Sequence, residues 1–508
     1  MSCIGVGWLL LDGWHTIPGW IWKDKDENAK RNDEKPTDDG SKSTRSGSSR
    51  SSTANNEGGD DDMSSLSAIA QKLTKLFDVM QAKLSIPAMV DGMNNSKEDD
   101  DLLFPLLATI QLLAQYKERF EGERTQLYAK SGRAGTPADL DGLQLGFELA
   151  DLAYENNTDR LRQQLSEKYG FRLLKHDVTV LPGYLGHYIA LHKKTKTALV
   201  GVRGTSSFEE MITDCCGLSV THTLTDGTQM TCHEGIYISS KRLADDLVDF
   251  VEELILPAGY KMKLVGHSLG AAGAALVALM LKASIPSLNS GNMDLKSILS
   301  LSFDPTKGDE RLSVLAYASP PVLDFSNAEK CSSFITTVVN NADIIPRCSL
   351  SNLQIASEVL QGVKRKLKEK GMEDNRPETI WKQLSRGTDG ELLMELEEYE
   401  ESLDKAKTKI SIDDSENLFC PGKIVVLYDK WNQNKSFFDE KDGNDSNDDD
   451  TIKDTKTAIG FVVPDEKGGT TALRLFDWSE RMVSDHFSAA YRSSLKSIVD
   501  MTEPKDFA

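Results

Sequence analysis

A serine between two glycines is the residue of this sequence best suited to act as a nucleophile. The motif is Gly266-His267-Ser268-Leu269-Gly270, which follows the apolar run 261–265 and precedes the small residues 271–275. A strand before the motif, a helix after it and small neighbours permit the strained turn that exposes a serine hydroxyl. Because a serine hydroxyl is a weak nucleophile near neutral pH, the chemistry also requires a general base. We therefore predict Ser268 as a nucleophile that depends on partners elsewhere in the sequence.

The general base can be identified by elimination from the order of residues along the chain. The motif resembles the nucleophile elbow of the α/β-hydrolases. In that fold the serine, the acid and the histidine follow one another in this order along the chain. Seven of the eight histidines lie before Ser268: His15, His176, His187, His192, His222, His233 and His267. Only His486 lies downstream. We predict that its imidazole takes the proton of the Ser268 hydroxyl.

The acid that orients this histidine has two leading candidates. Asp343 directly follows the strand-like run 334–339, and loops at strand ends carry catalytic groups in such sheets. Asp324 follows the preceding predicted strand. We favour Asp343, whose carboxylate would orient His486 and stabilise the imidazolium that forms.

Two hydrogen-bond donors are needed for the negative charge of a tetrahedral intermediate. Leu269, the residue after the nucleophile, supplies one backbone N–H in a turn of this kind. The second donor is expected from an early strand-end loop, and the sequence Arg203-Gly204-Thr205-Ser206 has that position upstream of the motif. We predict that Thr205 donates through its backbone N–H, with its hydroxyl as a further candidate donor.

The elements that must position these residues alternate between strands and helices. Strands are expected from Phe171 and over 187–192, 198–202, 261–265, 312–317, 334–339, 424–428, 458–463 and 472–476. The spacing of apolar residues predicts helices over 140–154 and 235–255 and from Ser488 onward. This alternation predicts an α/β fold in which a mostly parallel central sheet is flanked by helices.

The N-terminal part of the chain differs in composition from this predicted domain. Residues 1–22 are hydrophobic and hold four of the seven tryptophans. Polar residues and a proline interrupt the run, so two interpretations stand: an interfacial membrane anchor, with Cys3 as a candidate acylation site, or a flap packed on the fold. Residues 23–62 are predicted as a disordered linker and residues 63–135 as a helical region. The α/β domain is expected over 136–508.

The charge and the cysteines limit the partners of the protein. A net charge of −20 argues against nucleic acid and against electrostatic attraction to anionic lipid, since both require a concentrated basic face. The acidic runs, among them the insert 431–456, are predicted to be solvated, with regulatory Ca²⁺ binding as a less favoured alternative. Seven cysteines without a CxxC pair indicate free thiols in a reducing, cytoplasmic compartment and no metal site.

These motifs together resemble the class 3 lipases. The matching stretches are LVGVRGTSS, the turn His233-Glu234-Gly235 before a long helix, LVGHSLGAA, AYASPP, NNADIIPR and the late DHF sequence. Within the family the chain is most similar to the sn-1-specific diacylglycerol lipases, on TDCCG, CHEGIYIS, the turn 319–321 and Arg347. The resemblance spans about residues 140–350 and 420–500. The four N-terminal transmembrane helices of the animal enzymes have no counterpart in this sequence.

The resemblance implies a triad of Ser268, Asp343 and His486, an oxyanion role for Thr205, a structural role for His233 and an acylglycerol substrate. It also implies a lid, for which the charged helical insertion 351–420 is the candidate; an ordinary surface insertion is the alternative.

We therefore predict a serine lipase that hydrolyses acyl esters, with diacylglycerol as the favoured substrate, no metal or organic cofactor, and peripheral membrane contact. The alternatives are a phospholipase A1 or galactolipase, an acyltransferase using the same acyl-enzyme, and a non-catalytic lipid-binding scaffold.

Overall fold

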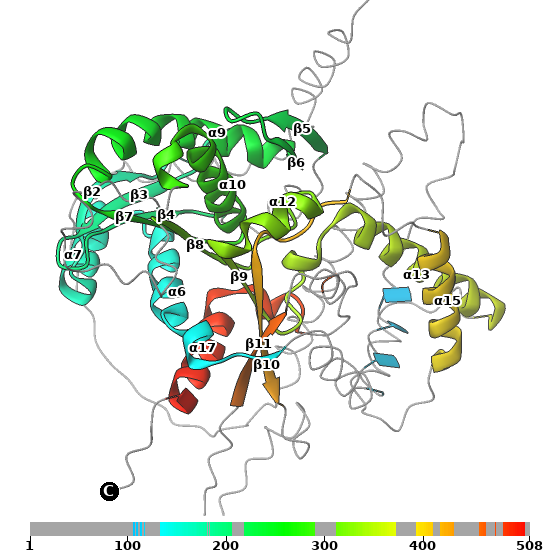
Figure 1. The fold of residues 1–508 in the computed structure, drawn as a ribbon. Helices are drawn as coiled ribbons and strands as arrows, with labels where there is room; N and C mark the ends of the chain where they lie inside the picture. Colours follow the sequence, from blue (N-terminus) through cyan, green and yellow to red (C-terminus); the bar gives the residue numbers. More distant parts are fainter. Residues whose placement is uncertain are drawn as a thin grey trace, which may run out of the picture. The chain divides into compact units, whose positions relative to one another are not determined.

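The computed structural model describes the α/β part of the chain (Figure 1). The described residues are 133–179, 181, 183–205, 218–289, 311–371, 393–409, 417–430, 457–463, 473 and 481–502, together with a few residues of 105–116. The predictions for residues 1–22, 23–62 and 431–456, and most of the helical region 63–135, lie outside these residues. The strand expected over 472–476 lies outside them too, except for Leu473, which is in a turn.

One sheet of nine strands forms the centre of the described fold. Its strands, in spatial order, are β1 (Arg133–Ala134), β11 (Thr457–Val463), β10 (Lys423–Lys430), β9 (Ile335–Asn340), β8 (Leu312–Tyr317), β7 (Lys261–His267), β4 (Thr197–Val202), β3 (His187–His192) and β2 (Arg172–Asp177). The five strands from β10 to β4 are parallel to one another. Beyond them on both sides, each strand pairs antiparallel with its neighbour. The predicted α/β fold is confirmed, with its parallel part confined to the five central strands.

Helices cover both faces of the sheet (Figure 1). They are α5 (Pro137–Leu140), α6 (Leu143–Asp151), α7 (Thr158–Tyr169), α9 (Glu234–Asp249), α10 (Leu269–Ser284), α12 (Phe325–Lys330), α13 (Leu350–Glu369), α15 (Leu396–Lys409) and α17 (Ser488–Thr502). A 3-10 turn, η2 (Leu152–Tyr154), extends α6, and a π-helical turn, η3 (Phe250–Ile255), extends α9. The helices predicted over 140–154 and 235–255 therefore form, with a change of helix type near their ends. A separate hairpin pairs β5 (Ser219–Thr223) with β6 (Gln229–His233).

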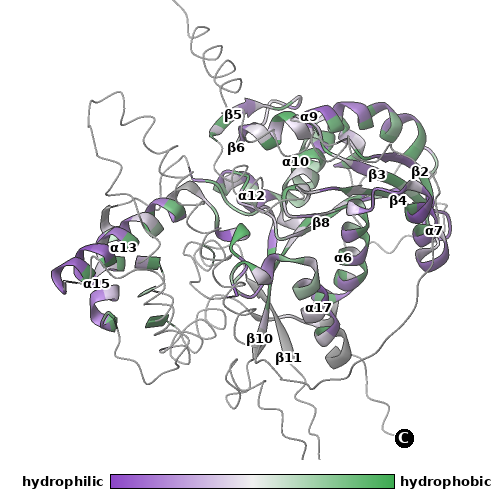
Figure 2. Ribbon diagram, turned by 180° about the vertical axis from the view of Figure 1, so that it is seen from behind, coloured by the Kyte–Doolittle hydropathy of each residue, from purple (hydrophilic) through white to green (hydrophobic). Residues whose placement is uncertain are grey.

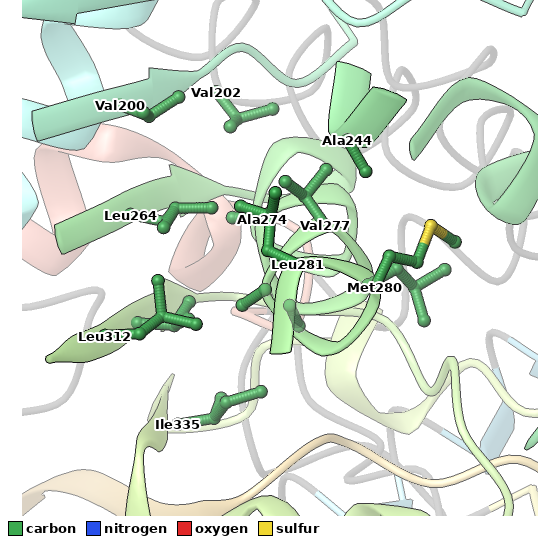
Figure 3. Close-up of a cluster of buried hydrophobic side chains, with 14 of the residues drawn as sticks. Val200, Val202, Ala244, Leu264, Ala274, Val277, Met280, Leu281, Leu312 and Ile335 are labelled. Carbon is green, nitrogen blue, oxygen red and sulfur yellow. The ribbon is translucent and has the colours of Figure 1, made fainter. Parts of the chain in front are cut away.

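Alternate residues of each central strand enter two separate apolar cores. Val200 of β4 and Leu264 of β7 pack with α9 and α10 on one face, as Figure 3 shows. Leu199 and Val265, the neighbouring residues on the same strands, pack with α6 and α17 on the other face. This is the period of two that a strand buried on both faces requires.

Helix α10 is almost entirely buried because its first half consists of small residues. All positions from 270 to 278 are buried, most of them alanine or glycine. Short side chains let the helix axis approach β4, β7 and β8 closely, and the helix contacts all three strands. The position of this helix matters because it begins directly after Ser268.

The helical insertion 351–420 contains the paired helices α13 and α15. Both helices carry hydrophilic and hydrophobic residues along their length (Figure 2). They pack against each other, and ion pairs link Lys366 to Glu401 at 3.5 Å and Lys370 to Glu398 at 2.7 Å. The shielding role suggested for this insertion stays a prediction. In the described part of the chain, none of the helices has the length and hydropathy needed to cross a bilayer.

A glycine on α6 offers a test of this packing. A Cβ on Gly146 would collide with the side chains of Leu315 and Tyr317 on β8, so Gly146→Ala should destabilise the fold by about 1–3 kcal/mol. Gly235→Ala is the matched control in α9, where the nearest atom lies 3.6 Å from the new Cβ. That substitution should be neutral or stabilise by up to about 1 kcal/mol. Thermal unfolding measures both, and equal melting temperatures for the two variants would contradict the close α6–β8 packing.

Candidate active site

The turn at Ser268 has the geometry of a strained strand-to-helix elbow. β7 ends at His267 and α10 begins at Leu269, so Ser268 alone makes the turn. Its backbone has φ 60° and ψ −131°, a region that costs a non-glycine residue on the order of 1–3 kcal/mol. The Ser268 amide donates a 2.8 Å hydrogen bond to the carbonyl of Tyr317 on β8, which fixes the turn against the neighbouring strand.

The two glycines of the motif are required by close backbone contacts. A Cβ on Gly266 would collide with the carbonyl of Gly270, across the turn itself. A Cβ on Gly270 would collide with the carbonyl of Val202, at the end of β4. The glycine spacing therefore lets the first turn of α10 lie against both β7 and the strand-end loop that follows β4.

The loop carrying Thr205 lies beside Ser268. A Cβ on Gly204 would be 3.3 Å from Cβ of Ser268 and 2.6 Å from the carbonyl of His267. The Thr205 hydroxyl is buried and has no hydrogen-bond partner among the described residues. A buried, unpaired donor is unfavourable unless something else occupies its hydrogen-bonding position. Together with the amide of Leu269 at the N-terminus of α10, this arrangement is suited to an oxyanion.

The predicted acid and base are in direct contact. His486, in the short helix η9 (Ser484–His486), lies with Nδ1 2.9 Å from Oδ1 of Asp343, and the two residues are 3% and 0% exposed. A carboxylate only accepts hydrogen bonds, so the proton of a neutral His486 imidazole lies on Nδ1. Nε2 is then the basic nitrogen, as a general base acting on a hydroxyl requires.

Three further groups hold the Asp343 turn. The Tyr491 hydroxyl on α17 donates to Oδ2 at 2.7 Å, and the Ile345 amide donates to Oδ1 at 3.0 Å. The fully buried Arg347 donates to the carbonyls of Asp343 at 2.6 Å and of Asn341 at 2.9 Å. These contacts keep the acid in one orientation.

The electrostatics of the pair favour an ionised Asp343. Burial alone would raise the pKa of this carboxyl, but the adjacent His486 imidazole and the hydrogen bonds from His486, Tyr491 and the Ile345 amide hold its pKa below the ordinary value. Burial and the neighbouring carboxylate raise the pKa of Tyr491 well above its usual range, so the phenol stays a donor.

His267 connects the elbow to the histidine loop. Its Nε2 lies 3.0 Å from the carbonyl of His486, and the two rings are 4.9 Å apart between centroids. Burial, with a further contribution from His486, lowers the pKa of His267 to about 3, so the ring is neutral and Nε2 donates to that carbonyl. Nδ1 then accepts from the Tyr154 hydroxyl at 3.2 Å. The imidazole of His486 is thereby held beside the residue that precedes Ser268.

Further hydrogen bonds join the residues before His486 to those before Asp343. The Asp485 carboxylate accepts from the Ala342 amide at 3.3 Å and pairs with Arg481 at 3.0 Å. The Asn340 side chain donates to the carbonyl of Asp485 at 3.0 Å. His486 therefore sits on a backbone fixed from both sides.

Of the two candidate acids, only Asp343 is hydrogen-bonded to His486 in the described part of the structure. Asp343 contacts His486, whereas Asp324 caps α12, and its carboxylate accepts from the amides of Thr231 at 2.9 Å and Asn327 at 3.1 Å. His233 caps α9 by accepting from the Ile236 amide at 3.3 Å, as its predicted structural role requires.

The four described cysteines are buried free thiols, and no group of metal-binding side chains gathers in the described part of the chain.

Sequence reasoning missed several residues that support the site. Tyr491 lies five residues after the histidine on a helix whose spacing predicts only burial, and nothing in its neighbourhood marks its contact with Asp343. The sequence identifies His267 only as part of the motif and Tyr154 only as the end of a predicted helix. Asp485 stood next to the predicted base, and its acidic side chain was the one local signal available.

The fold and the elbow define an α/β protein with a serine at the strand-to-helix turn after its central strand β7. Residues 199–353 match the family model for lipase (class 3). Mouse diacylglycerol lipase-beta is 26% identical over 227 residues, which cover 41% of this chain and 30% of the relative. Human diacylglycerol lipase-alpha is 25% identical over 261 residues, which cover 47% of this chain and 22% of the relative. The chain thus spans less than a third of the length of these relatives.

Among solved structures, the propeptide complex of Rhizomucor miehei lipase is similar, with 20% identity and a TM-score of 0.32 over 42% of this chain and 65% of that one. The lipase from Rhizopus microsporus var. chinensis gives 20% identity and a TM-score of 0.33 over 42% of this chain and 70% of that one.

The contact between Tyr491 and Asp343 predicts a pH-dependent stability effect. A carboxyl whose pKa is lowered by folding stabilises the protein above its unfolded pKa of about 3.9, and this contribution is lost as the pH falls through the folded value. Tyr491→Phe removes a donor to the charged form, so its loss of melting temperature should be largest near neutral pH and should shrink below about pH 4.

Tyr188→Phe is the matched control, because its buried hydroxyl donates to the carbonyl of Leu149 at 2.7 Å and to no carboxylate. The loss of melting temperature caused by Tyr188→Phe should be the same near neutral pH and below about pH 4. Scanning calorimetry at several pH values measures both variants. A loss for Tyr491→Phe that does not change with pH would show that the phenol does not stabilise the Asp343 carboxylate.

Proposed function

We propose that this protein is a serine lipase that cleaves acyl ester bonds through an acyl-enzyme on Ser268. The observation that carries the proposal is the buried 2.9 Å hydrogen bond between His486 and Asp343, on a loop that is itself bonded to the neighbour of Ser268. A non-catalytic lipid-binding scaffold has no need of an oriented imidazole backed by a buried carboxylate. The match of residues 199–353 to the lipase (class 3) family model supports the same conclusion.

In the proposed reaction, Nε2 of His486 takes the proton of the Ser268 hydroxyl as the oxygen attacks the ester carbonyl. Asp343 stabilises the imidazolium, and its lowered pKa keeps it ionised while it does so. The amides of Leu269 and Thr205 and the Thr205 hydroxyl stabilise the oxyanion. His486 then protonates the leaving alcohol, and a water molecule, activated by the same base, releases the fatty acid.

The proposed substrate is an acylglycerol, with diacylglycerol favoured. The support for the finer assignment is the similarity to proteins named diacylglycerol lipases, which is limited to part of their length. Phospholipase A1 and galactolipase activities use the same chemistry and differ in the head group that the site accepts. An acyltransferase differs only in the acceptor that resolves the acyl-enzyme.

The central test is Ser268→Ala assayed in parallel with the wild type on diacylglycerol, triacylglycerol, phosphatidylcholine and a galactolipid. Loss of the nucleophile should lower the rate by at least about a thousandfold on every substrate, and should abolish labelling by a fluorophosphonate probe. Ser240→Ala is the control, since it removes a buried hydroxyl that has no hydrogen-bond partner among the described residues. It should keep wild-type activity.

Each outcome of this panel has a meaning. Hydrolysis that persists in Ser268→Ala would remove the elbow from the mechanism. A wild-type preference for phosphatidylcholine or the galactolipid would replace diacylglycerol as the substrate, and acyl transfer to added alcohols in place of hydrolysis would indicate an acyltransferase.

The unpaired Thr205 hydroxyl gives a second prediction. Thr205→Val keeps the shape of the side chain and the backbone N–H but removes the hydroxyl donor, so kcat should fall by roughly a hundredfold with little change in KM. Thr205→Ser retains a hydroxyl and should stay within a few-fold of the wild type. Steady-state kinetics on one soluble ester measure both. If Thr205→Val and Thr205→Ser have equal kcat values, the hydroxyl has no part in stabilising the oxyanion.

A further inference from the structure

Large apolar side chains are exposed at nine positions of the described residues. They are Leu145, Leu174, Val178, Leu181, Tyr184, Leu218, Ile238, Leu254 and Phe487. Single exposed apolar residues are ordinary on a protein surface, whereas a group on one edge indicates an interaction surface.

Val178, Leu181 and Tyr184 lie on the connection from β2 to β3. Because β3 is antiparallel to both β2 and β4, this connection lies at the end of the sheet where β4 has its C-terminus, which we call the active-site edge. The Arg203 amide donates to the carbonyl of Gly186 at 2.8 Å, so the connection runs next to the loop that carries Thr205. These three apolar residues are thus on the active-site edge.

Leu218 and Ile238 adjoin the same edge through the beginning of α9. The Glu234 amide donates to the carbonyl of Leu218 at 2.9 Å, and Ile238 lies one helical turn after Glu234. A Cβ on Gly183 would be 3.9 Å from Cγ2 of Ile238, so the helix touches the β2–β3 connection.

Phe487 belongs to the loop of the proposed base. It is 47% exposed although it directly follows the buried His486. Exposed apolar residues therefore flank both the oxyanion loop and the histidine loop. Leu254, by contrast, lies in the π-helical turn that precedes β7, at the opposite edge of the sheet.

We propose that Leu181, Tyr184, Leu218, Ile238 and Phe487 form an apolar rim that seats the active-site edge on the surface of neutral or zwitterionic lipid. This inference rests on the proposed function, since a lipid ester is presented to the site from such a surface. It goes beyond that function by naming the side chains that make the contact.

Charge decides which lipid surface the rim fits. The chain carries a net charge of −20, which opposes approach to an anionic membrane. Arg242 lies beside the rim, 4.0 Å above the Tyr184 ring, and donates to the carbonyl of Gly183 at 3.3 Å, so its charge is engaged within the protein. Apolar insertion, with the aromatic rings near the head groups, is the attraction that remains.

The test compares Leu181→Asp with Leu254→Asp in the full-length protein. The two leucines are 58% and 60% exposed and the substitutions add the same charge, so the variants differ in the edge that they alter. Co-sedimentation with phosphatidylcholine vesicles should show partitioning reduced about tenfold by Leu181→Asp and unchanged by Leu254→Asp. Ile238→Asp should repeat the loss from a separate element. Circular dichroism and thermal unfolding establish that each variant is folded.

The outcomes separate the rim from its alternatives. Equal vesicle binding by Leu181→Asp, Ile238→Asp and the wild type would overturn the proposal, as would binding by the wild type that rises when phosphatidylserine is added. A wild-type dimer that Leu181→Asp dissociates, without a change in vesicle binding, would assign the rim to a second copy of the chain. Hydrolysis of a soluble short-chain ester by the wild type tests the proposed function separately, because that substrate forms no surface.

Discussion

The close approach of helix α10 to strands β4 and β7 is the constraint on which the rest of the site depends. Ser268 has a backbone conformation that its own side chain disfavours, and only surrounding contacts can maintain it. Gly266 and Gly270 permit those contacts by leaving out the atoms that would separate the chains. The buried run of small residues that follows extends the same close packing along the helix, so the strain at one residue is supported by the apolar core between the sheet and helices α9 and α10.

The second requirement is a buried negative charge that is fully hydrogen-bonded. Asp343 is removed from water, which by itself opposes ionisation, and its partners come from a histidine loop, a C-terminal helix and its own turn. An arrangement of this kind orients the imidazole because the carboxylate has no freedom to turn away. The neutral His267 ring adds a link between this network and the elbow. Acid and base are therefore linked by polar contacts to the residue that precedes the serine.

The sequence allowed the elbow, the order of its partners and most strands of the sheet to be predicted, because each leaves a local trace. Glycine spacing marks the turn, apolar runs mark buried strands, and a single downstream histidine left one candidate base. The direction of a strand leaves no such trace, so the antiparallel edges formed by β2, β3 and β11 were not anticipated. The hydrogen bond from Tyr491 to Asp343 joins residues 148 positions apart, and no periodicity records a contact of that kind.

The distance along the chain between the acid and the base has a consequence for biosynthesis. Asp343 and His486 are 143 positions apart, and Ser268 precedes both. During translation, the serine turn and the carboxylate leave the ribosome well before the imidazole does. Strands β4, β7, β8 and β9 precede Asp343 or lie beside it in the sequence, whereas helix α17, which carries Tyr491, follows His486. The nascent chain consequently carries the nucleophile and the acid before it carries the base, and the proposed hydrolytic capacity cannot arise until residue 486 has been made.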